Sequence, residues 1–168
     1  MNSTAAPVLL DLPAIRKWPA GTFPTLDRVP RTDDQSSRER EFALMQAAFG
    51  RVGGLMSGSE AAHRIGRTCD QPISKLARWI VDHTIDSLQW RSNIQVPMFQ
   101  FEPSRMTLRE PVAQVIRELS GVLDGWETAL WFAEPNSWLA GRSPLEMVIE
   151  DPKGVFEAAR ADRFLAKG

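Results

Sequence analysis

The stretch WFAEPNSWLAGRSPLEM, Trp131–Met147, decides how the C-terminal part of the chain is organised. It begins inside an apolar helical pattern, which Pro135 ends because the residue before a proline is pushed out of the helical region. Ser143 followed by proline is typical of an N-cap and a first helical residue. Gly141 between them allows a positive φ or a close backbone approach. We therefore predict a stiff bend between two helices, here called the corner.

Helical periodicity extends to both sides of the corner. Apolar residues three and four positions apart predict helices over 110–120 and 125–134. Ser143 with Glu146 forms a capping box for a helix over 144–150, and Asp151 before a proline starts another over 152–165. The sequence therefore predicts a C-terminal domain of four helices over 109–168.

The preceding region, 36–108, has a different pattern. A capping box at Ser36 predicts a helix over 37–51, and another at Ser57 opens a short helix that stops at Gly66. A third helix is expected over 72–83, with an inward stripe made of Ile73, Leu76, Ala77, Ile80 and Val81. Two short β-prone runs, 88–90 and 94–96, are separated by three polar residues and predict a hairpin. Pro97 closes the hairpin, and residues 99–108 are expected to be an irregular connection.

Two short helices followed by a hairpin match a helix-turn-helix with a wing, an arrangement that places its second helix in the DNA major groove. The expected DNA-binding residues are Arg67, Ser74, Lys75, Arg78 and Arg91. Residues 51–92 hold only a small excess of basic over acidic side chains, although phosphate neutralisation supplies much of the affinity for DNA. A plain packing role for the helix pair therefore stays open.

The first 35 residues form a proline-rich arm. Proline fixes φ and removes a backbone donor, which argues against a helix or a central strand. The two interpretations are a disordered tail and an extended arm that lies in a groove of its own or a neighbouring subunit. Its prolines are Pro7, Pro13, Pro19, Pro24 and Pro30.

Composition narrows the function classes. The 168 residues carry 20 Lys and Arg against 21 Asp and Glu, so the chain as a whole is no general polyanion binder. A single cysteine, Cys69, excludes an internal disulfide framework. The longest apolar runs are too short to span a bilayer, and the N-terminus lacks the basic start of a signal peptide. We expect a cytoplasmic protein that makes no membrane contact.

No catalytic constellation is visible, so we expect no catalytic residues, no cofactor and no metal. His63, Cys69 and His83 are the candidate soft metal ligands, and their spacing fits no zinc pattern. The sequence contains no phosphate-binding glycine loop and no nucleophile elbow. A thiol enzyme built on Cys69 with a histidine is the weaker alternative, because nothing in the sequence places these side chains together.

The stretch Leu123–Val155, LDGWETALWFAEPNSWLAGRSPLEMVIEDPKGV, resembles the toxin-binding domain of Xre/MbcA/ParS-type antitoxins. That family's pattern is a tryptophan helix, Pro-Asn, two residues, leucine, a small residue, glycine, a basic residue, Ser or Thr, and Pro-Leu-Glu. The resemblance covers residue 111 to the C-terminus, and 97–101 is more weakly similar to a linker in members with an excisionase-like DNA-reading half. The pattern is met by Trp131, Pro135, Asn136, Leu139, Ala140, Gly141, Arg142, Ser143, Pro144, Leu145 and Glu146.

The resemblance implies the antitoxin of a type II toxin-antitoxin pair. Its partner would be a cognate RES-domain toxin that consumes NAD, blocked by C-terminal helices docked over the active-site cleft. The other half would bind operator DNA, and a homodimer is expected. The expected toxin-binding residues are Asn136, Trp138, Arg142, Arg160, Arg163 and Lys167. The alternative is a DNA-binding transcriptional regulator without a toxin partner.

Overall fold

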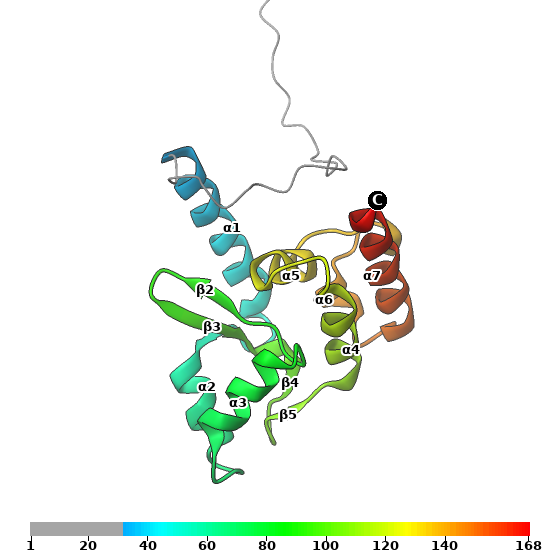
Figure 1. The fold of residues 1–168 in the computed structure, drawn as a ribbon. Helices are drawn as coiled ribbons and strands as arrows, with labels where there is room; N and C mark the ends of the chain where they lie inside the picture. Colours follow the sequence, from blue (N-terminus) through cyan, green and yellow to red (C-terminus); the bar gives the residue numbers. More distant parts are fainter. Residues whose placement is uncertain (1–31) are drawn as a thin grey trace, which may run out of the picture.

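The computed structural model describes residues 32–168, so the predicted proline-rich arm lies almost entirely outside the described residues. This part of the chain is mostly helical with two small antiparallel sheets (Figure 1). Helix α1 spans Thr32–Gly50, α2 Gly58–Ile65, α3 Pro72–Val81, α4 Glu110–Leu119, α5 Gly125–Ala133, α6 Pro144–Met147 and α7 Pro152–Lys167. Short 3₁₀ turns occupy Met98–Gln100 (η1) and Ser137–Leu139 (η2).

The predicted hairpin is present, and it pairs with a third strand that the sequence did not indicate. Strands β2 (Leu88–Trp90) and β3 (Asn93–Pro97) pair antiparallel, with Trp90 opposite Asn93. Strand β1 (Leu55–Ser57) adds to the other side of β3, with Met56 opposite Val96. Three residues are too few to show a strand periodicity, which is why β1 was missed.

The connection over 99–108 was expected to be irregular, and that expectation is wrong. After η1, strands β4 (Phe101–Glu102) and β5 (Thr107–Leu108) form a second, two-stranded sheet. The buried Gln100 side chain donates to the Pro97 carbonyl at 2.8 Å and to the Asp86 carbonyl at 2.9 Å. These bonds fold the connection back onto the chain, and a single polar side chain in a sequence does not reveal them.

Helix boundaries follow the predicted caps, with two corrections. Ser57, Ser143 and Asp151 each cap a helix as expected, and Ser143 with Glu146 forms a full capping box. Asp124 forms another full capping box at the start of α5, and this cap was not predicted. Helix α1, however, begins at Thr32, so Ser36 lies inside the helix and does not cap it. Helix α6 ends at Met147 and not at residue 150.

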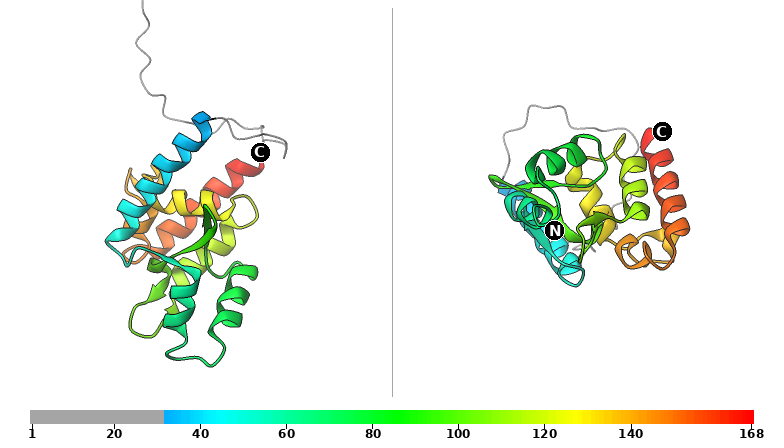
Figure 2. Two further views of the ribbon diagram at one scale, coloured as in Figure 1. Left: turned by 90° about the vertical axis from the view of Figure 1, so that its left-hand side faces the viewer. Right: turned by 90° about the horizontal axis from the view of Figure 1, so that it is seen from below.

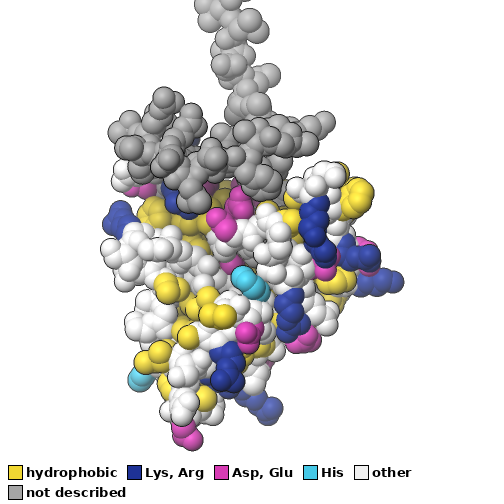
Figure 3. Space-filling view, viewed as in Figure 1, with side chains coloured by type: hydrophobic (Ala, Val, Ile, Leu, Met, Phe, Trp, Pro, Cys, Tyr) yellow, Lys and Arg dark blue, Asp and Glu magenta, His cyan; other side chains and the backbone are white. Residues whose placement is uncertain are grey.

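Helix α3 buries much less of its apolar stripe than predicted. Leu76 is buried and Ile80 is half-buried, but Ile73 and Val81 are each 75% exposed. The helix packs mainly against α2, whose Ala61, Ala62 and Ile65 face inward as predicted, so a narrow strip is covered. Figure 3 shows the resulting hydrophobic side chains on the surface over α2 and α3.

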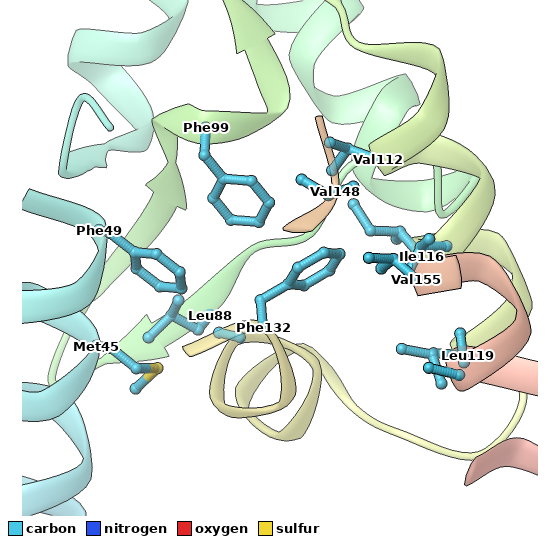
Figure 4. Packing of buried hydrophobic residues seen from close by; sticks show 14 of the residues in the cluster. Met45, Phe49, Leu88, Phe99, Val112, Ile116, Leu119, Phe132, Val148 and Val155 are labelled. Atoms are coloured by element: carbon cyan, nitrogen blue, oxygen red, sulfur yellow. The ribbon is translucent and has the colours of Figure 1, made fainter. Parts of the chain in front are cut away.

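The larger core cluster contains residues from both sides of the predicted boundary between 108 and 109. The smaller cluster is built from α2, α3, β1, β3 and the β4–β5 hairpin. The larger cluster joins α4–α7 to Phe42, Met45 and Phe49 of α1, and Phe132 of α5 lies at its centre (Figure 4). Helix α1 therefore packs with the C-terminal helices, because its apolar face meets α5 and not the α2–α3 pair.

Helices α4 and α7 lie side by side, and the view from below shows them as neighbouring columns (Figure 2). Among the described residues, no helix is both long enough and apolar enough to cross a membrane.

Candidate functional site

The corner between α5 and α6 is a closed backbone loop. The Asn136 N–H donates to the Arg142 carbonyl, and the Gly141 N–H donates to the Asn136 carbonyl, both at 3.0 Å. Ala140 and Gly141 both have positive φ, at 54° and 81°. Two consecutive residues with positive φ reverse the chain sharply, and the glycine tolerates this conformation at little cost. The backbone therefore supports the stiff bend that the sequence predicted.

A single carboxylate on α7 holds the side chains of the corner. Asp162 accepts from the indole Nε1 of Trp131 at 2.7 Å, from the Asn136 amide at 2.8 Å and from the Trp138 indole Nε1 at 2.9 Å. Hydrogen bonds to an ionised acceptor are stronger than those between neutral groups. The end of α5, the 3₁₀ turn η2 and α7 are thus joined at one point.

Trp138 is the most prominent side chain of this arrangement. It is 57% exposed, yet its backbone N–H donates to Asn136 Oδ1 and its indole N–H is held by Asp162. An exposed tryptophan with both polar groups already bonded presents its apolar ring in one orientation. Tryptophan in such a setting is a favoured anchor of protein interfaces.

The three predicted corner residues have different environments. Arg142 is exposed, and its guanidinium pairs with Glu150 at 3.2 Å. Asn136 is only 9% exposed. Its side-chain amide donates to Asp162, and its Oδ1 atom accepts from the Trp138 backbone N–H. In this conformation the Asn136 side chain is directed inward, and its contact with a partner stays a prediction. Its amide positions Trp138, because it bonds inward on both sides.

The predicted basic edge of α7 is partly neutralised. Arg163 binds Glu118 of α4 at 2.6 Å, and Arg160 pairs with Glu157 at 3.3 Å on the helix surface. Arg163 therefore fastens α7 to α4, and its side chain remains partly exposed. Lys167 is exposed in the last turn, and Lys and Arg side chains cluster on the right of the face shown in Figure 3.

Sequence reasoning missed two residues of α7, Asp162 and Leu165. Asp162 follows the buried positions Val155, Ala158 and Ala159 at helical spacing, and an acid on a buried stripe is a signal for an internal partner. Leu165 lies one turn beyond Asp162 and is 62% exposed. We define the docking surface as Trp138, Arg142 and Leu165.

The predicted DNA-binding residues lie on α3 and at two separate turns. Ser74 and Arg78 are exposed on α3, while Lys75 lies 4.9 Å from the Trp79 ring centroid. Arg67 belongs to the α2–α3 turn, at the bottom of Figure 1, and Arg91 to the β2–β3 turn, at its left. The structure therefore brings Ser74, Lys75 and Arg78 together and leaves the two turns apart.

Two carboxyl groups have displaced pKa values. Burial raises the pKa of Asp86 well above its ordinary range, the backbone hydrogen bond from Ser87 lowers it, and the Asp124 carboxylate raises it. Burial also raises the pKa of Glu134, at the start of the corner, and the Glu41 carboxylate adds to this effect. Displaced pKa values often accompany function.

Within residues 32–168, no three His, Cys, Asp or Glu side chains are arranged to hold a metal ion. Cys69 is half-buried next to the smaller core, whereas His63 is exposed on α2. No family model, curated protein or solved structure gives a significant match to this chain.

Proposed function

We propose that this chain is an antitoxin that captures a protein partner on its docking surface. The observation that carries the proposal is Trp138, exposed on the corner and fixed there by Asp162 and Asn136. The partner class comes from the resemblance of 123–155 to Xre/MbcA/ParS-type antitoxins, and it is a RES-domain toxin.

The geometry suits binding better than catalysis. A side chain that is already immobilised loses little conformational entropy when a partner covers it. The two positive-φ residues and the triple hydrogen bond to Asp162 provide that immobilisation. Leu165 extends the apolar surface along α7, and Arg142 adds a charge at its rim. A tryptophan anchor flanked by an aliphatic side chain and a rim charge is a common composition for an interface centre.

The second part of the proposal is operator binding through α2, α3 and the β2–β3 hairpin, as a helix-turn-helix with a wing. Ser74 and Arg78 offer a hydroxyl and a guanidinium on the exposed side of α3. Arg67 and Arg91 would contact phosphates at two separate points, and a homodimer would present two such units to a two-fold operator.

The test is co-purification of the full chain with the product of the neighbouring reading frame. Trp138→Ala should weaken capture at least about 30-fold, the loss expected for an interface anchor. Val81→Ala removes an exposed apolar side chain on α3 and should bind normally. Trp138→Phe keeps an aromatic ring without the indole N–H, and separates loss of the ring from loss of the Asp162 bond. Equal capture by Trp138→Ala and the wild type would refute the docking surface.

Point variants are required because deletion of the C-terminal half is not a clean test. Removing α5–α7 would strip the partners of Phe42, Met45 and Phe49 from the larger core. A regulator without a toxin partner is distinguished by the same experiment. That alternative predicts DNA binding that Arg78→Ala weakens and no capture of the neighbouring gene product.

A further inference from the structure

A pocket lies where the segment after α3 meets the turn between α4 and α5. Its volume is about 150 Å³. Its walls come from 80–87 on one side and from 116–128 on the other, and we call it the junction pocket. A cavity on the order of 150 Å³ can hold a molecule the size of benzene. The pocket therefore has room for a small ligand or for the end of a side chain.

The contact between its two walls is close. A side chain at Gly125 would overlap the Ser87 carbonyl oxygen, so only glycine fits at the first position of α5. The Asp86 backbone is held in turn by Gln100, which accepts from the Asp86 N–H and donates to its carbonyl. The wall formed by 80–87 is thus held by the Gln100 side chain on one side and lies closely against Gly125 on the other.

Asp86 is the unusual group of this pocket. Its side chain is buried, and its Oδ2 atom has no hydrogen-bond partner within the described residues. A buried carboxyl with an unused oxygen is costly unless it is protonated or meets a cation. The other polar residues of the lining are Asp124, which also caps α5, and Ser87, Ser120 and Thr128. The lining therefore offers acceptors and negative charge, with apolar side chains between them.

We propose that the junction pocket binds a guanidinium or primary ammonium group, with Asp86 as its counter-ion. This proposal goes beyond the antitoxin function and does not depend on it. Such a group carries several N–H donors and a positive charge, which match the carboxyl and hydroxyl acceptors of the pocket. The alkyl part of the ligand would lie against Ile80, Ile85 and Leu123.

An open hollow beside the pocket provides the entrance. It shares His83, Ser120 and Leu123–Gly125 with the junction pocket and is bounded on its other side by Ala166 and Lys167. A cation that enters here passes the ends of α3, α4 and α7. The bound cation would therefore contact residues that belong to both core clusters. The other titratable residues of the lining are Asp124 and His83, and Lys167 lies at the entrance.

The experiment titrates methylguanidinium chloride into the ¹⁵N-labelled full chain and follows amide chemical shifts, with sodium chloride at equal ionic strength as the reference. We expect saturable shifts at 83–87 and 120–128, with a Kd on the order of 1 mM for so small a ligand. Asp86→Asn should weaken binding at least tenfold. Asp70→Asn, which removes an exposed acid from the α2–α3 turn, should leave binding unchanged.

Two further measurements, with a second ligand and at different pH values, identify the source of the cation and the role of the Asp86 charge. N-acetyl-arginine amide binding as tightly as methylguanidinium would show that a side chain can enter, whereas exclusive binding of the smaller probe would indicate a free cation. Affinity should rise with pH, because the ligand competes with a proton on Asp86, and His83→Gln should retain that rise. Non-saturating shifts, or identical binding by Asp86→Asn, would overturn the proposal.

Discussion

At the level of single residues, Asp162 contributes most to the shape of the corner. One carboxylate receives three donors that come from α5, from the loop after it and from η2. Its removal leaves the Asn136 amide buried without its acceptor, and an unsatisfied buried donor costs more than the bond itself was worth.

Asp162→Ala should therefore lower the free energy of unfolding by about 2–4 kcal/mol. It should also weaken partner capture, because Trp138 would lose its fixed orientation. Urea denaturation measures the first effect and co-purification the second. Asp70→Ala, at an exposed acid, is the control and should change stability by less than about 0.5 kcal/mol. An unaltered midpoint for Asp162→Ala would show that the triple hydrogen bond contributes nothing.

The raised pKa of Asp86 predicts how the free energy of unfolding changes with pH. The folded state binds its proton more tightly than the unfolded state, where the pKa is about 3.9. Its contribution to stability is thus complete below about pH 4 and is lost as pH rises through the folded pKa. Asp86→Asn, which cannot ionise, should match the wild type at low pH and become progressively more stable above it.

The difference between the two proteins should grow by at most about 1.4 kcal/mol per pH unit, the limit for one proton. Denaturation midpoints from pH 4 upward, without added organic cations, give the comparison. Glu134, whose pKa is also raised, titrates in both proteins and cancels in the difference. A difference that shrinks with rising pH would contradict the assignment.

At the level of elements, the corner stores backbone strain at Ala140. This residue adopts the left-handed conformation with φ 54° and ψ 33°, next to a glycine that already has positive φ. The left-handed region costs an alanine roughly 1–2 kcal/mol relative to the right-handed one. The hydrogen bonds of Asn136 around the loop offset that cost.

Ala140→Gly should stabilise the protein by about 0.5–1 kcal/mol, since relief of strain exceeds the added freedom of the unfolded chain. The same substitution at Ala47, on the exposed side of α1, should have the opposite sign and a similar size. Thermal or urea unfolding of the two variants provides the test. Destabilisation of both would mean that Ala140 is not strained.

At the level of the whole molecule, α1 joins the C-terminal helices into one core. Phe42 stacks on Trp90 with ring centroids 4.1 Å apart, and Phe49 stacks on Phe99 at 5.2 Å. The Trp126 indole donates to Glu41 at 2.8 Å, which adds a polar tie between α5 and α1. Helix α5, which leads into the corner, is therefore supported by residues of α1.

Phe49→Ala should lower stability by about 3–5 kcal/mol, the usual cost of truncating a buried phenylalanine. It should also reduce hydrogen-exchange protection in α4 and α5, although the mutation lies in α1. Leu44→Ala, on the same helix at a side chain that is 41% exposed, should cost less than about 1 kcal/mol. Retained protection in α4 and α5 would show that α1 is an independent element.

Local chemistry in the sequence determined most of the helix starts and the corner. Asp124, Ser143 and Asp151 bond backbone groups three residues away, so the information lies within one turn of the chain. The β2–β3 hairpin was predictable for the same reason, since its strands are joined by a two-residue turn.

Only the tertiary structure decided which apolar side chains are buried and which polar side chains form internal hydrogen bonds. Ile73 and Val81 share the helical spacing of Leu76, yet α2 covers one strip of α3 and leaves the others exposed. The sequence predicted Asn136 at the surface, but its side chain is directed inward by a hydrogen bond to Asp162, 26 positions later in the chain. The junction pocket and its buried Asp86 arise where 80–87 meets 116–128. Contacts across such distances depend on how the helices pack, and the pattern within any single segment does not contain them.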